Sequence, residues 1–148
     1  MTIGNDKEFK AALAALDPSR QRQVAARFVE SVLGLCGDVR VAGAVQAAKR
    51  PDITDVELAA LYQAAKSASV ETYTQCGRET DWAAQAGHFV CKAAVNCVKP
   101  AVAHDILAWD AAMEARMART CASIASGGGT ETREAETQYG LLESFLSA

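Results

Sequence analysis

Apolar residues recur along most of the chain at intervals of three and four, the spacing that places side chains on one face of an α-helix. The first two runs are Phe9, Leu13 and Leu16, and then Val24, Phe28, Val32 and Leu35. The charged residues of the second run lie off its apolar stripe: Arg20, Arg22, Arg27 and Glu30. The pattern predicts an all-α fold, a single compact bundle of six to seven helices with antiparallel neighbours.

Residues that cap helix N-termini mark most of the predicted boundaries. Asp17 before Pro18, Asp38, and Thr54 with Glu57 three residues later are such signals, and Thr80 or Asp81 is another. Thr54 and Glu57 form the capping-box pattern, in which each side chain accepts a bond from the other residue's backbone amide. We therefore predict helices over residues 6–16, 18–35, 38–49, 54–76, 81–98 and 100–125, and a last one beyond residue 130.

The fifth predicted helix has only one charged side chain, Lys92, within residues 82–98, so we expect it to be the central and most buried element. Its predicted buried stripe comprises Trp82, Ala86, Phe89, Ala93 and Cys97. The sixth helix has a corresponding stripe of large residues: Ile106, Trp109, Met113, Met117 and Ile124.

The run of three glycines at 127–129 is the one linker signal in the sequence. It divides the chain into a helical bundle at residues 1–126, a linker at 127–130 and an amphipathic helix at 131–148. The apolar residues of that helix are Tyr139, Leu142, Phe145 and Leu146. They need a surface to cover them, so we expect the helix to dock on the bundle or on a second copy, which would give a homodimer.

Composition and charge narrow the class of protein. Alanine supplies 31 of the 148 residues, which favours closely packed helices over an all-β sandwich. The net charge of −3 arises beyond residue 129, where Arg133 stands against four glutamates. No basic stripe and no long apolar run is present, so we expect neither nucleic acid nor membrane as a partner. The five cysteines form no CxxC pair, and we predict free thiols and a cytoplasmic protein.

His88 and Cys91 are three residues apart on the fifth predicted helix and could supply two metal ligands, with His104 or Cys76 as further ones. No HExxH motif, second close His/Cys pair or nucleophile signature accompanies them. We therefore predict no metal, no cofactor and no catalytic residues. The alternative is a small helical metal-binding protein or enzyme that uses His88, Cys91 and carboxylates.

Glu79, Asp81 and His88 are the candidate partner-binding residues. Glu79 and Asp81 lie in an acidic segment, together with Glu71, before the fifth helix. Such carboxylates either compensate the positive end of the helix dipole or form a docking surface for a basic partner. The sequence leaves both interpretations open.

From Arg27 to about Met117 the sequence resembles the immunity proteins of bacterial polymorphic toxin systems. The resemblance rests on Asp38-x-Arg40, on the alanine-rich segment 45–49 and above all on segment 83–90, which reads Ala-Ala-Gln-Ala-Gly-His-Phe-Val. It implies a small, alanine-rich, all-helical protein without enzymatic activity, which binds a toxin and neutralises it.

Overall fold

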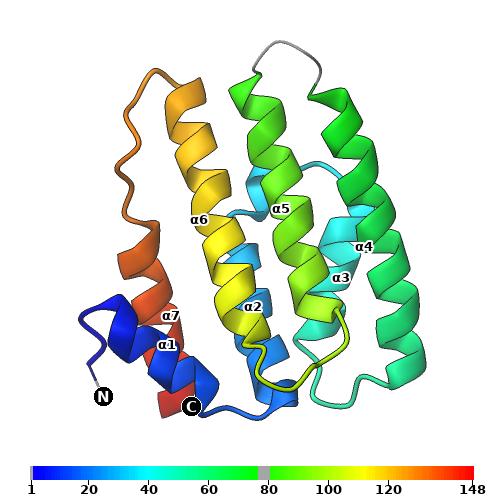
Figure 1. Ribbon diagram of the computed structural model, residues 1–148, viewed down its shortest axis with the longest axis vertical. Coiled ribbons are helices and arrows are strands. Elements are labelled where there is room, and N and C mark those ends of the chain that lie inside the picture. The colour runs from blue at the N-terminus through cyan, green and yellow to red at the C-terminus, as the bar shows by residue number, and fades with distance from the viewer. Residues whose placement is uncertain (1, 77–80) are drawn as a thin grey trace.

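The computed structural model describes residues 2–76 and 81–148, which form seven α-helices, one short 3₁₀ helix and no strand. The elements are α1 (Asp6–Ala14), α2 (Pro18–Glu30), η1 (Leu33–Leu35), α3 (Val39–Ala48), α4 (Asp55–Gln75), α5 (Trp82–Val98), α6 (Leu107–Ala125) and α7 (Glu134–Ser147). In Figure 1, α4, α5 and α6 stand side by side in front of α2 and α3, and α1 and α7 lie together at one edge. The predicted all-α bundle is confirmed.

Four of the predicted N-caps are confirmed. The side chains of Asp17, Asp38, Thr54 and Asp81 each accept a hydrogen bond from a backbone amide in the first turn of the following helix. Both halves of the capping box are formed by Thr54 and Glu57. These boundaries depend on residues at most three apart, which is why the sequence alone could predict them.

The predicted end of the second helix is wrong, because α2 stops at Glu30 and not near Leu35. The carbonyl of Ser31 accepts a hydrogen bond of 2.9 Å from Nη2 of Arg119 on α6. The chain then passes through η1, and Cys36 follows it in an extended conformation. A contact between distant parts of the chain therefore replaces the continuation of the helix.

The sixth helix begins at Leu107 and not at Pro100. Two neighbouring residues of α2, both 7% exposed, hold the connection before it. Arg22 donates hydrogen bonds to the carbonyls of Cys97 and Lys99 at the end of α5, and Gln21 accepts one from the amide of Ala108 at the start of α6. Arg22 was expected on the polar side of its helix, and burial of its guanidinium corrects that expectation.

Helix α5 is central, since it packs against α2, α3, α4, α6 and η1. The buried faces of α5 and α6 are made mainly of small residues: Ala86, Cys91, Ala93, Ala94 and Cys97 on α5, and Ala108, Ala111, Ala112, Ala115, Ala118 and Cys121 on α6. The predicted stripe of α5 is confirmed at Ala86, Ala93 and Cys97, and the predicted stripe of large residues on α6 is wrong in part. Phe89 is half-buried, Trp82 is 38% exposed and Met117 is 45% exposed. Small side chains let two helices approach closely, and the larger ones then lie beside the contact.

Helix α7 packs against α2 and α6 of the same chain. Leu142 and Gln138 are completely buried, and Nε2 of Gln138 donates to the carbonyl of Ala112 on α6. The glycine segment before it closes α6: Gly127 has a φ of 86°, and the amide of Gly128 donates back to the carbonyl of Ser123. This arrangement is a Schellman motif, which requires the positive φ that glycine adopts without strain.

Candidate functional site

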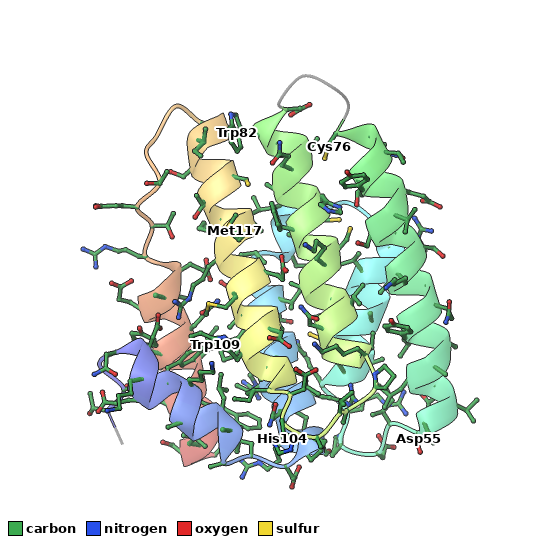
Figure 2. All side chains as sticks on the ribbon, in the orientation of Figure 1. Asp55, Cys76, Trp82, His104, Trp109 and Met117 are labelled. Carbon is green, nitrogen blue, oxygen red and sulfur yellow. The ribbon has the colours of Figure 1, made fainter. Side chains whose placement is uncertain are left out.

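Two hollows open between the C-terminal half of α4 and the N-terminal half of α5. We call the larger one, of about 640 Å³, the outer hollow, and the smaller one, of about 350 Å³, the inner hollow. The outer hollow is lined by Tyr73, Thr74, Cys76, Gln85, His88, Phe89 and Lys92. The inner hollow is lined by Leu35, Cys36, Gly37, Asp38, Glu71, Thr72, Gln75, Ala83, Ala84 and Gly87. Cys76 and Trp82 mark this end of the bundle in Figure 2.

A hydrogen bond between Thr72 and His88 connects the two helices at this site. Oγ1 of Thr72 lies 2.9 Å from Nδ1 of His88 and 2.9 Å from the carbonyl oxygen of Ala68. When the hydroxyl donates to that carbonyl, it accepts from the histidine, and this arrangement places the ring proton on Nδ1. In the neutral ring Nε2 is then the unprotonated nitrogen.

Burial and the positive charge of Lys92 lower the pKa of His88 below its ordinary value of 6.5. The ring is therefore neutral near pH 7. It packs between two other aromatic rings, with centroid distances of 5.7 Å to Tyr73 and 5.8 Å to Phe89. Lys92 itself lies 3.5 Å from a carboxylate oxygen of Glu114. His88 thus joins α4 to α5 and also lines the outer hollow.

Cys36 and Cys91 form a close thiol pair, with their sulfur atoms 3.7 Å apart. The close approach of η1 to α5 brings them together, since a Cβ atom added at Gly87 would lie 3.3 Å from the carbonyl oxygen of Leu35. Either thiol can donate to the other sulfur, and donation from the S–H group of Cys91 lowers the pKa of Cys36 to about 6. The same bond, together with burial, raises the pKa of Cys91.

Nδ1 of His88 contacts Thr72, whereas the sulfur of Cys91 contacts that of Cys36, and the Thr72 side chain also interacts with Cys91. His104, considered above as a further metal ligand, is exposed at the opposite end of the bundle from Cys76 (Figure 2). Within residues 2–76 and 81–148 there is no group of three or more His, Cys, Asp or Glu side chains that could hold a metal ion.

The three predicted partner-binding residues have different surroundings. Asp81 is exposed, and its Oδ1 accepts the 3.0 Å bond from Ala84 that caps α5. His88 is half-buried in the outer hollow, and Glu79 lies outside the described residues. Glu71, from the same acidic segment, contacts Nη2 of Arg40 at 2.5 Å and lines the inner hollow.

Sequence reasoning placed no large apolar side chains on the surface here, but the structure exposes several. Tyr73 is 71% exposed, and Val70, one turn earlier on α4, is also exposed. Phe89 lines the outer hollow. Trp82 lies two turns earlier, at the N-terminus of α5. Only the position of Val70 was a usable signal, because it follows the buried Ala65 and Ala68 by five and two residues and so lies away from their face. Tyr73 follows Ala65 by eight residues, a same-face spacing.

A further hollow, of about 750 Å³, lies at the other end of α4 and α5. Its polar lining includes Arg22, whose guanidinium already binds the two carbonyls at the end of α5. Its apolar lining comprises Pro18, Pro51, Ile53, Leu58, Ala59, Val98, Pro100 and Ala101. The guanidinium of Arg22 therefore has a structural role, which is to hold the end of α5.

Comparison of the chain with protein-family models, with curated proteins and with solved structures finds no match. None of the described helices has the length and apolar character needed to cross a membrane.

Proposed function

We propose that this chain is a non-enzymatic protein-binding module, an immunity-like inhibitor that binds a bacterial toxin. The binding site is at the end of the bundle where α4 ends and α5 begins. The contact surface, which we call the aromatic edge, consists of Val70, Tyr73, Trp82, His88 and Phe89. The observation that carries the proposal is the exposure of Tyr73 at the outer hollow, together with the exposure of Trp82 at the same end of the bundle (Figure 2). Aromatic side chains are enriched in protein interfaces and supply much of their binding energy.

The partner that fits this surface is a basic protein. Among the described residues around the two hollows, the positive groups Lys92 and Arg40 are each paired with carboxylates. Asp81 is an exposed negative charge beside Trp82, and the segment just before it in the sequence adds one negative charge, Glu79, and one positive charge, Arg78. Opposite charges on a partner would accelerate association and fix its orientation.

The test uses the product of a toxin-like reading frame next to the gene for this chain. Its dissociation constant is measured with the parent protein and with Tyr73→Ala and Trp82→Ala. We expect each substitution to weaken binding by roughly tenfold or more. Val56→Ala, at the other end of α4 and 81% exposed, is the matched control and should bind like the parent.

Asp81→Asn separates charge from folding, because asparagine also caps a helix N-terminus but has no charge. We expect this variant to associate more slowly and with a weaker dependence on salt, while its circular dichroism stays unchanged. The proposal fails if no toxin-like frame adjoins the gene, or if all these variants bind like the parent. Stoichiometric zinc or iron in the purified protein would instead favour the metal-binding alternative.

A further inference from the structure

We propose that Cys36 and Cys91 are a peroxide-oxidisable pair, which a hydroperoxide converts into an intramolecular disulfide. The two sulfur atoms are 3.7 Å apart and belong to different elements, the connection after η1 and helix α5. A disulfide has a sulfur–sulfur distance of about 2.05 Å, so the sulfurs must approach by less than about 2 Å. This inference does not depend on the toxin-binding proposal.

The two thiols differ in access, which sets the order of reaction. Cys36 is half-buried and lines the inner hollow, whereas Cys91 is completely buried behind it. An oxidant entering the inner hollow therefore reaches Cys36 first. Of the other thiols, Cys97 and Cys121 are buried, and that of Cys76 donates to the carbonyl of Thr72.

The groups around Cys36 favour its thiolate, the form that attacks peroxides. The pKa of Cys36 is lowered by its hydrogen bonds with the thiol of Cys91, 3.7 Å away, and with the backbone of Asp38. The carboxylate of Asp38 opposes them, but Arg40 binds that carboxylate through Nε and Nη2. Glu71 lines the same hollow and binds the same arginine.

The reaction is a two-electron oxidation in two steps. The Cys36 thiolate attacks one peroxide oxygen, the O–O bond breaks, and the other oxygen leaves as an alcohol or water after taking up a proton. Cys36 is then a sulfenic acid. The sulfur of Cys91 attacks the sulfur of Cys36, the S–O bond breaks, and water leaves with the proton of Cys91. In sum, two thiols and one hydroperoxide give one disulfide, one alcohol and one water.

The experiment treats the reduced full-length protein with hydrogen peroxide, blocks the remaining thiols and digests with trypsin. Cleavage after lysine and arginine places each of the five cysteines on its own peptide, with Cys36 on residues 28–40 and Cys91 on residues 79–92. We expect two of the five thiols to disappear and these two peptides to be linked. Addition of a thiol reductant should restore both thiols.

Two single variants test the order of reaction, and a third is the control. Cys91→Ser should accumulate a sulfenic acid at Cys36 that dimedone traps, because the resolving thiol is missing. Cys36→Ser should keep Cys91 reduced. Cys76→Ser should form the same linkage as the parent. The proposal is overturned if the parent keeps all its thiols, or if the lost thiols are found in bonds between two chains. Linkage of any other pair of peptides also overturns it.

Discussion

The carboxylate of Glu134 accepts a hydrogen bond of 2.9 Å from Nε of Arg119, and it is only 4% exposed although it lies in the first turn of α7. Its second oxygen accepts a bond of 2.7 Å from the hydroxyl of Ser31 at the end of α2. One side chain therefore holds three helices together: α2, α6 and α7.

We expect Glu134→Ala to lower the free energy of unfolding by about 2 kcal/mol, because it removes charge-assisted bonds and leaves a half-buried hydroxyl and a guanidinium without their acceptor. Denaturant unfolding measures the loss. Glu136→Ala changes an exposed residue in the same turn and should cost less than about 0.5 kcal/mol. Equal effects of the two substitutions would contradict the central role of Glu134.

The small-residue face of α6 gives a second prediction. Ala111 is completely buried in the core, so Ala111→Leu must force the neighbouring helix away and should cost about 2 kcal/mol or more. Phe89→Ala removes a ring that is only half-buried and should cost about 1 to 2 kcal/mol, less than for a core phenylalanine. Ala60→Leu, at an exposed position of α4, is the control for Ala111→Leu. The reverse order of the two costs in denaturant unfolding would refute this description of the core.

His88 makes stability depend on pH in a defined direction. Its pKa in the folded protein lies below the ordinary 6.5, so in acid the unfolded chain takes up a proton more readily than the folded one. The contribution of neutral His88 to the free energy of unfolding is fully present above about pH 6.5 and is lost as the pH falls below that value.

The thiol of Cys36 titrates in a similar range, so the test compares the parent with His88→Asn. Between about pH 7.5 and about pH 5.5 the melting temperature should fall further in the parent than in the variant. His104→Asn changes an exposed histidine with a φ of 71°, which asparagine tolerates, and should behave like the parent. A parent and a His88→Asn variant with parallel profiles would exclude this role.

The hydrogen bonds of Arg22 should stabilise the last turn of α5. Arg22→Met keeps a long apolar stem but removes the donors to the carbonyls of Cys97 and Lys99, and we expect a loss of about 2 kcal/mol. Hydrogen exchange should accelerate in the last turn of α5 and in the first turn of α6. Arg133→Met, at an exposed site, should leave both measurements unchanged. Unaltered exchange at the end of α5 in Arg22→Met would show that the cap is dispensable.

The sequence predicted those features that depend on neighbouring residues. The all-α class and the four N-caps follow from spacing and from side chains that bond within three residues, as in Thr54 and Glu57. Arg22 binds carbonyls more than seventy positions away, and Cys36 meets a thiol 55 positions away. No local pattern specifies such pairs, because they exist only once the helices are packed.

The orientation of the helices was the second feature that the sequence did not specify. Helix α6 has a stripe of large residues and a stripe of small ones, and hydrophobicity alone favours burying the large stripe. The bundle buries the alanines instead and leaves Trp82 and Met117 at its surface. The aromatic edge therefore could not be found by a search for buried stripes. The pairing of Cys36 with Cys91 could not be predicted either, because it depends on where η1 packs against α5.

The two ends of the chain lie together. The amide of Ile3 donates a bond of 2.6 Å to the carboxylate of Glu143 in α7. Both termini therefore leave the molecule at the lower corner of the α1–α7 edge, away from the end that carries Trp82 and Cys76 (Figures 1 and 2). An affinity tag or a surface anchor at either terminus would leave the aromatic edge facing the solution. For the same reason a short peptide joining the two termini would allow circularly permuted versions of the bundle.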